Sequence, residues 1–188
     1  MKAMLVVLTI ACASCMRQSP HVAHSPEAHL SSTDGTWRSF PALLRDSPFT
    51  VLIFFSATCP CQTAHDARLR QLHQGYAPRG IQFVAIDSEV GASLERDANE
   101  AQRRAYPFPI LMDPQALLAK AFVAEYATYS VILDGNGSIL YRGGIDSDRT
   151  HLRDDATFFV REALDDLLAG HPPRRPDAKT LGCALQRD

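Results

Sequence analysis

The sequence has no excess of charge of either sign, because its 188 residues contain 19 Lys and Arg against 21 Asp and Glu. Without a large basic cluster, we expect no nucleic-acid partner. Beyond residue 15 the chain also lacks an apolar run of the about 20 residues that a membrane span needs, so the body of the protein is expected to be soluble. Internal repeats are absent as well. One domain with tails is the organisation that these features predict.

The first 15 residues resemble an export signal. Lys2 precedes an apolar segment that begins at Ala3 and ends in small residues around Cys15. This pattern is typical of a signal peptide over residues 1–15. Cleavage before Cys15 would make it the lipidated first residue of a bacterial lipoprotein, and ordinary signal-peptidase cleavage is the alternative. We therefore expect an exported protein, either periplasmic or tethered to the membrane through a lipid anchor.

Residues 16–36 are predicted to be a flexible tether, because they contain prolines, serines and three histidines without apolar periodicity. The packed part is expected to begin with Trp37 and Phe40. It is predicted to extend over residues 37–170 as a single domain. A tail over residues 171–188 completes the chain.

Two of the five cysteines follow a continuous apolar segment. The run Phe49–Phe55 has no polar alternation, which predicts a strand covered on both faces. Pro60 is tolerated in a first helical turn, and Leu69 and Leu72 continue at helical spacing. Cys59 is thus expected at a helix N-terminus. There, unpaired backbone N–H groups and the macrodipole favour a nucleophilic thiolate, which we expect to be exposed.

A simple stabilising disulfide between Cys59 and Cys61 is the alternative interpretation. Its loop would be very short, so it would contribute little to stability through chain entropy. A third cysteine, Cys183, follows in the tail within Lys-Thr-Leu-Gly-Cys. Once the signal is removed, three cysteines remain for chemistry, which is an odd number. An odd number indicates a free reactive thiol, an intermolecular bond or a metal site.

The rest of the sequence predicts an α/β fold with a central mixed sheet flanked by helices. A strand over residues 81–86 should pair in parallel with the first, since the helix between them serves as a crossover. The other predicted elements are a helix capped by Ser93, a short helix opening at Pro114, a hairpin around the turn Asp-Gly-Asn-Gly at 134–137, and a final helix opening at Asp154 and Asp155.

Four motifs occur in a characteristic order: Phe-Phe-Ser-Ala-Thr-Cys-Pro-Cys at 54–61, Tyr-Pro-Phe-Pro-Ile-Leu-Met-Asp-Pro at 106–114, Val-Ile-Leu-Asp-Gly-Asn-Gly at 131–137 and Tyr-Arg-Gly-Gly-Ile-Asp at 141–146. Together they resemble exported bacterial redoxins of the alkyl-hydroperoxide-reductase and thiol-specific-antioxidant superfamily, including its thiol-disulfide oxidoreductases. The resemblance covers about Trp37 to Gly170 and implies a thioredoxin fold. The Gly-Cys of the tail is also similar to the C-terminus of some of these redoxins.

The resemblance implies that Cys59 is the nucleophile and attacks a disulfide of a partner. Either Cys61 or Cys183 would then resolve the mixed disulfide. Protein or small-molecule disulfides and thiols, together with a redox partner protein, are the expected partners, and no cofactor is required. Thr58 would either hydrogen-bond the thiolate or satisfy the backbone of its loop.

The sequence departs from the pattern of the family at two positions. Thioredoxin-like oxidoreductases carry two residues between their cysteines, whereas only Pro60 intervenes here. The family also places a cis-proline opposite the cysteines, and the matching position is Tyr129, after Thr128. That proline normally helps to dock an extended substrate and keeps metals away.

Two further functions follow from the same residues. His65 lies four residues after Cys61, on the same helix face. Cys59, Cys61 and His65, with Cys183 as a further ligand, would suit Cu(I) or Zn(II), similar in outline to thioredoxin-fold copper chaperones. A buried packing role is the alternative for His65. Thiol peroxidase activity is the third function, although Leu52 stands where peroxiredoxins carry a proline.

Overall fold

The computed structural model of the chain describes residues 26–187. The predicted signal segment 1–15, the predicted lipidation site Cys15 and the first part of the predicted tether lie outside the described residues. Among the described helices, none combines the length and the apolar character that crossing a lipid bilayer would need.

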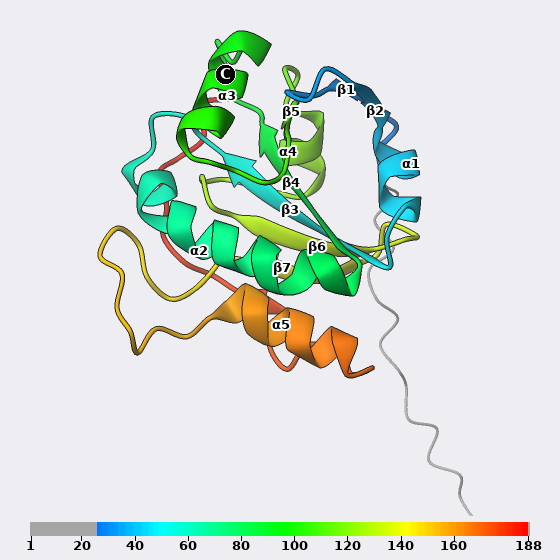
Figure 1. Cartoon of the computed structure of the whole chain (residues 1–188), viewed down its shortest axis with the longest axis vertical. Helices are drawn as coiled ribbons and strands as arrows, with labels where there is room; N and C mark the ends of the chain where they lie inside the picture. Colours follow the sequence, from blue (N-terminus) through cyan, green and yellow to red (C-terminus); the bar gives the residue numbers. More distant parts are fainter. Residues whose placement is uncertain (1–25, 188) are drawn as a thin grey trace, which may run out of the picture.

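A six-stranded mixed sheet in the order β5-β4-β3-β6-β7-β8 forms the centre of the molecule (Figure 1). Its middle strand, β3 (Phe49–Phe55), pairs in parallel with β4 (Ile81–Asp87) and antiparallel with β6 (Ser130–Asp134). The other strands of the sheet are β5 (Ile110–Met112), β7 (Ile139–Gly143) and β8 (Asp177–Ala178). The predicted covered strand, parallel crossover and hairpin are all confirmed.

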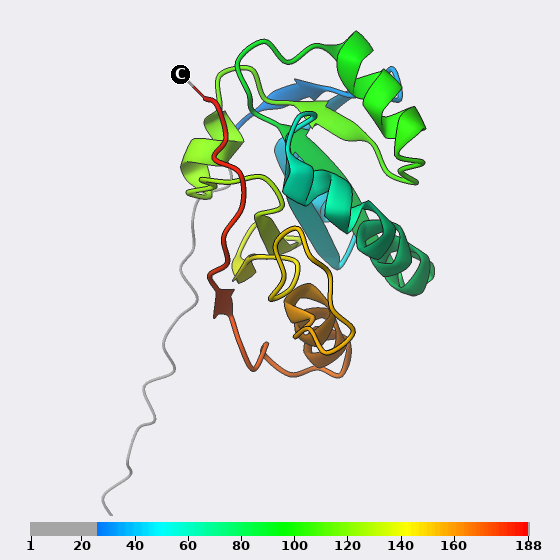
Figure 2. The ribbon, with the colours of Figure 1, turned by 90° about the vertical axis from the view of Figure 1, so that its left-hand side faces the viewer.

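Alternate residues of β3 face two separate apolar cores, because successive side chains of a strand point to opposite faces. The core that contains Ile53 also contains side chains of α2 and α5, whereas the core that contains Phe54 includes side chains of α1 and α4. In Figure 2, α2 and α4 lie on opposite sides of the sheet. The helices are α1 (Phe40–Arg45), α2 (Pro60–Tyr76), α3 (Leu94–Arg103), α4 (Leu117–Ala121) and α5 (Phe159–Leu168).

The segment before α1 is more ordered than a tether. β1 (His29–Ser31) pairs antiparallel with β2 (Trp37–Ser39), and Leu30 is buried in the core beside α1. The tether predicted for residues 16–36 therefore includes part of the packed domain. Of the two residues predicted to begin the packed part, Phe40 is fully buried, whereas Trp37 is 75% exposed. Three-residue strands are too short for their alternation to stand out in the sequence.

Two predicted helix starts are displaced. α5 begins at Phe159, not at Asp154 and Asp155, and α4 begins at Leu117, three residues after Pro114. At α4 the carboxylate of Asp113 still satisfies the helix start, because it accepts the N–H groups of Leu117 and the next two residues. The cap of α3 is as predicted, since the side chain of Ser93 accepts the N–H of Arg96.

Candidate functional site

Cys59 lies where β3 gives way to α2. Its backbone is extended (φ −78°, ψ 122°), and it occupies the N-cap position, with Pro60 as the first helical residue. The carbonyl of Cys59 accepts the N–H of Thr63 at 3.2 Å, which is the first hydrogen bond of the helix. Proline suits this position because its fixed φ is helical and its missing N–H would have no partner there. The predicted helix N-terminus at Cys59 is confirmed.

Cys59 is not the exposed thiolate that the sequence predicts. It forms a disulfide with Cys183, with the two Cα atoms 5.9 Å apart, and it is only 2% exposed. The C-terminal segment that carries Cys183 covers it, and a sequence separation of 124 residues concealed this cover. Cys183 itself is only partly buried. The more accessible residue of the pair is therefore Cys183.

Cys61 is a free thiol in the first turn of α2, and it is also buried. Its sulfur lies 3.7 Å from the sulfur of Cys183. The sulfurs of Cys59, Cys61 and Cys183 all lie within 4.8 Å of one another. Of the two partners considered for Cys59, the structure pairs it with Cys183, and the third sulfur stands directly beside the bond.

Backbone hydrogen bonds hold the tail on the domain on both sides of the disulfide. The N–H of Ala127 donates to the carbonyl of Cys183 at 2.8 Å, and the N–H of Leu185 donates to the carbonyl of Glu125 at 3.0 Å. Figure 2 shows this segment, in red, running beside the yellow-green chain that follows α4. The tail is thus docked by its main chain as well as by its cysteine.

Gly182 is required by this docking. A Cβ atom at Gly182 would lie 2.5 Å from the carbonyl oxygen of Ala127 and 2.6 Å from a ring carbon of Tyr126. Both distances are shorter than van der Waals contact, so a side chain would force the tail away from the segment that it pairs with. The Gly-Cys pair of the tail motif therefore has a physical explanation.

Thr128 and Tyr129 lie beside the end of β3. The N–H of Thr128 donates to the carbonyl of Phe54, and the N–H of Phe54 donates to the carbonyl of Tyr129, both at 2.8 Å. Thr128 has φ +73°, which is rare for a β-branched residue. The peptide bond before Tyr129, which matches the cis-proline position of the family, is trans, since no cis bond occurs in residues 26–187. Burial raises the pKa of Tyr129 to about 12.

Thr58 and Pro60 form the exposed rim of the site. Because Cys59 is disulfide-bonded, the predicted hydrogen bond from Thr58 to a thiolate stays a prediction for the reduced form. The two residues flank Cys59, which is covered.

His65 is buried, and its ring nitrogens are engaged away from the sulfurs. Nδ1 lies 2.8 Å from the carbonyl oxygen of Cys61, and Nε2 lies 3.1 Å from a carboxylate oxygen of Asp146. Among the described residues, the metal-ligand-like cluster contains the three cysteines and not His65. The predicted ligand set of Cys59, Cys61 and His65 is therefore not brought together, and the packing alternative describes His65 better.

Asp146 is a site residue to which the sequence reasoning assigned no role. Its fully buried carboxylate accepts hydrogen bonds from Arg68 at 2.7 Å and from the N–H of Asp148 at 2.8 Å, in addition to its contact with His65. Burial disfavours its charge, but the hydrogen bond and the charge of His65 hold the pKa of Asp146 below its ordinary value. The network fixes the first turns of α2 to the loop after β7. In the sequence, Asp146 was marked only as the last residue of the motif at 141–146.

A second group of buried acids lies beneath the end of the tail. The N–H of Val90 donates to the carbonyl of Gln186 at 2.7 Å, and the loop of Val90 follows Asp87 at the end of β4. Asp87 is buried beside Asp97, and Arg96 contacts both carboxylates. Burial, followed by the neighbouring charge of Asp97, raises the pKa of Asp87 to about 7.

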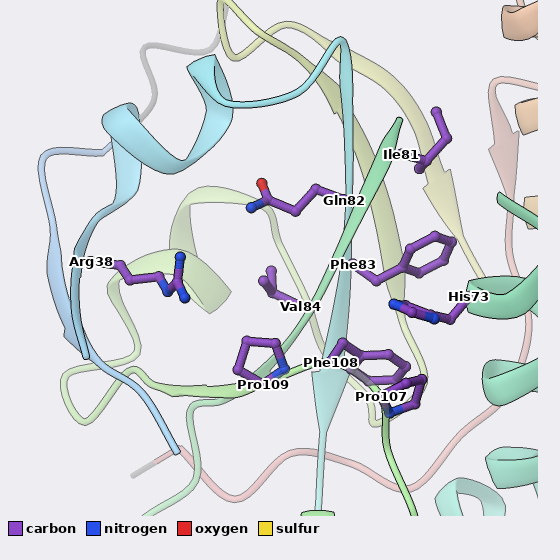
Figure 3. Close-up of a pocket in the computed structure, with 9 residues that line it drawn as sticks. All are labelled: Arg38, His73, Ile81, Gln82, Phe83, Val84, Pro107, Phe108 and Pro109. Atoms are coloured by element: carbon purple, nitrogen blue, oxygen red, sulfur yellow. The ribbon is translucent and has the colours of Figure 1, made fainter. Parts of the chain in front are cut away.

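Cysteines do not line either of two surface pockets formed by the described residues. One, of about 200 Å³, lies at the edge of β4 and includes His73, Phe108 and Arg38 (Figure 3). The other, of about 330 Å³, lies between β8 and the segment of Tyr126 and Tyr129. The three sulfurs lie away from both pockets, where Cys183 of the tail meets the start of α2.

Comparisons with known proteins agree with this geometry. Residues 22–161 match the AhpC/TSA family. A search of curated proteins found no significant match. Among solved structures, an uncharacterised conserved protein from Geobacillus kaustophilus is 30% identical, with a TM-score of 0.78 over 87% of this chain and 89% of that one.

Two less similar solved structures are named as redox proteins. Peroxidoxin BcpB from Mycobacterium tuberculosis is 24% identical, with a TM-score of 0.51 over 60% of this chain and 77% of that one. A secreted disulfide oxidoreductase of the same organism, homologous to E. coli DsbE, is 18% identical, with a TM-score of 0.50 over 60% and 80%. These likenesses confirm the thioredoxin-like fold. The chain belongs to the AhpC/TSA family of thioredoxin-like redox proteins.

Proposed function

We propose that the protein is a thiol-disulfide oxidoreductase of the cell envelope that cycles between a Cys59–Cys183 disulfide and the corresponding dithiol. The observation that carries the proposal is this disulfide, which joins the first residue of α2 to a docked tail. Membership of a redox family supports it. No cofactor is needed, because thiol-disulfide exchange transfers electrons directly between sulfur atoms.

Reduction begins at Cys183, the more accessible residue of the pair. An external thiolate attacks the sulfur of Cys183 and forms a mixed disulfide. The bond to Cys59 breaks, and its electron pair leaves on the sulfur of Cys59. A thiolate at the start of α2 is favoured by the helix dipole and the free N–H groups, and a good leaving thiolate accelerates exchange. A second external thiolate then displaces Cys183, which completes the dithiol.

The reverse reaction uses Cys59 as the nucleophile. Its thiolate attacks a partner disulfide, and Cys183 then attacks the sulfur of Cys59, which restores the internal bond and releases the partner as a thiol. Breaking the internal bond also removes the covalent link that holds the tail over Cys59. The exposed residues Thr58 and Pro60 would form the contact surface for the partner.

The test is the reduction of a model protein disulfide by catalytic amounts of the protein, with dithiothreitol as the electron donor. We expect Cys59→Ser and Cys183→Ser each to abolish turnover. Mass spectrometry of the single variants should find the mixed disulfide on whichever of the two cysteines remains. Wild-type turnover in Cys59→Ser would refute the proposal.

The same assay with hydrogen peroxide as the oxidant separates the peroxidase alternative. A thiol peroxidase would oxidise Cys59 to a sulfenic acid, and Cys183 would close the same disulfide with loss of water. We expect the disulfide substrate to react faster than the peroxide, since Leu52 replaces the proline of peroxiredoxins. Faster reaction with peroxide would reverse this assignment.

Export and lipid anchoring remain part of the proposal. Cell fractionation should find the protein in the envelope, and Cys15→Ala should release it from the membrane if Cys15 carries lipid. A protein that stays in the cytoplasm would contradict the proposed location. In that case the disulfide partners would have to be sought there.

A further inference from the structure

Three cysteine sulfurs converge at one point of the fold, although only two of them are needed for the proposed redox cycle. Cys61 takes no part in the disulfide, yet its buried sulfur lies 3.7 Å from that of Cys183. We propose that the dithiol form of the protein binds one Cu(I) ion through Cys59, Cys61 and Cys183, and that closure of the disulfide releases it. This inference rests on the proposed function only in requiring that the Cys59–Cys183 pair can be reduced.

The spacing of the sulfurs suits a three-coordinate thiolate site. Metal–thiolate bonds of about 2.3 Å, arranged in a plane around one ion, place the ligand sulfurs about 4 Å apart. Cys61 and Cys183 are already 3.7 Å apart, and all three sulfurs lie within 4.8 Å of one another. Reduction lets the sulfurs of Cys59 and Cys183 separate to the same spacing. Only small side-chain movements are needed to form the site.

The third ligand stays in place when the disulfide opens. The hydrogen bond from Ala127 to the carbonyl of Cys183 and the bond from Leu185 to Glu125 do not involve sulfur. The close packing of Gly182 against this segment is also independent of the bond. The tail therefore keeps Cys183 beside α2 in the dithiol form, so that binding does not bear the full entropic cost of ordering a free tail.

The donor set favours Cu(I) over Zn(II). Structural zinc sites are almost always tetrahedral and need a fourth ligand, but the cluster of described residues contains only the three sulfurs. The nearby imidazole of His65 is held by Cys61 and Asp146. Soft thiolates are typical ligands of Cu(I), and the surrounding apolar core limits access of water. The N-terminus of α2 offsets part of the negative charge of the three thiolates.

Release is coupled to the redox cycle. A disulfide substrate accepts two electrons from the thiolates of Cys59 and Cys183, which join to each other, and it leaves as two thiolates. Copper keeps its oxidation state. It loses two of its three ligands and remains in contact with Cys61 alone, so it transfers to any competing thiolate site.

The test is an anaerobic Cu(I) titration of the full chain against a chromogenic Cu(I) chelator. Cys12 and Cys15 are changed to serine so that the three site cysteines are the only thiols of the chain. We expect one Cu(I) per reduced chain and at least about 100-fold weaker binding by the oxidised chain. Cys61→Ser should weaken binding by more than about 100-fold, since even residues behind the ligands change metal affinity by 10- to 100-fold.

Peptide mapping shows whether Cys61→Ser still forms the Cys59–Cys183 disulfide, which separates loss of the ligand from loss of the fold. X-ray absorption at the copper edge should find three sulfur neighbours and no imidazole. Equal Cu(I) affinity of reduced and oxidised protein, an unchanged affinity of Cys61→Ser, or a preference for Zn(II) over Cu(I) would each overturn the inference. A pair that cannot be reduced would instead overturn the proposed function.

Discussion

Removal of the Cys59–Cys183 disulfide should lower the free energy of unfolding by about 3–5 kcal/mol. The bond closes a loop of 124 residues, and the loss of chain entropy in the unfolded state gives about 5 kcal/mol at 25 °C for a loop of that length. Stabilisation of the Cys59 thiolate at the start of α2 offsets at most about 2 kcal/mol of this in the reduced protein. A domain has a total stability of roughly 5–15 kcal/mol, so the reduced protein should be much closer to unfolding. The corresponding decrease in Tm is roughly 6–20 °C for a chain of this size.

The assay is urea unfolding of oxidised and reduced protein, followed by circular dichroism. Cys183→Ser should resemble the reduced wild type and show no response to reductant. Cys61→Ser is the matched control, because it removes a thiol of the same turn but keeps the cross-link, so its oxidised and reduced forms should differ as those of the wild type do. A difference below about 1 kcal/mol between oxidised and reduced wild type would refute the reasoning.

Three further predictions concern the groups around the sulfurs. Gly182→Val should lower the equilibrium constant of disulfide formation by about 10- to 100-fold. The added side chain would strain the docked tail by about 1–3 kcal/mol, and thiol titration in redox buffers measures the equilibrium constant. Between about pH 4 and 7, folded Asp87 holds its proton more tightly than the unfolded chain does, so its contribution to the free energy of unfolding falls as the pH rises. Asp97→Asn should make this fall smaller, and unfolding measured at several pH values checks it. Asp146→Asn should reduce the free energy of unfolding by about 1–3 kcal/mol, because it removes the carboxylate that contacts buried His65 and accepts a hydrogen bond from Arg68, which keeps its second partner Asp148; urea unfolding measures it.

Two of these predictions have a control in the same chain. Gly75→Ala should leave disulfide formation unchanged, since no atom lies within 4 Å of the added Cβ and Gly75 needs no positive φ. Asp155→Asn changes a carboxylate that is 83% exposed and should alter stability by less than about 0.5 kcal/mol. For the pH profile, an Asp97→Asn variant that loses as much stability between pH 4 and 7 as the wild type does would contradict the effect of Asp97 on the pKa of Asp87.

The sequence predicted those parts of the fold that depend on local patterns. The run Phe49–Phe55 indicated a covered strand, and the Cys-Pro pair indicated the start of α2, because both signals act within one element. The hairpin around 134–137 follows from turn chemistry, and the carboxylate of Asp134 does accept N–H groups of that turn. The helix start at Cys59 could therefore be placed without coordinates.

The docked tail and the buried polar network could not be predicted from local patterns. Cys183 reaches the site by main-chain pairing with residues 125–127, which leaves no side-chain periodicity, and Gly182 was its only local trace. In α3, Asp97 is buried because Arg96 pairs with it, and no local pattern of the sequence indicates this. Long-range partners decide the burial of such polar groups, and a single sequence does not contain them.

The fold acts on the reduction potential of the disulfide in two opposite ways. The entropy term that stabilises the oxidised chain by about 5 kcal/mol makes the bond harder to reduce in the folded protein than in the unfolded chain. Stabilisation of the Cys59 thiolate at the start of α2 favours reduction, but such a helix-end effect reaches at most about 2 kcal/mol. The loop term is larger, and the net 3 kcal/mol or more corresponds to a potential about 60–100 mV below that of the denatured chain.

Equilibration with dithiothreitol buffers measures both potentials. A native potential equal to or above the denatured one would mean that thiolate stabilisation dominates, and the protein would then act as an oxidant and not as a reductant.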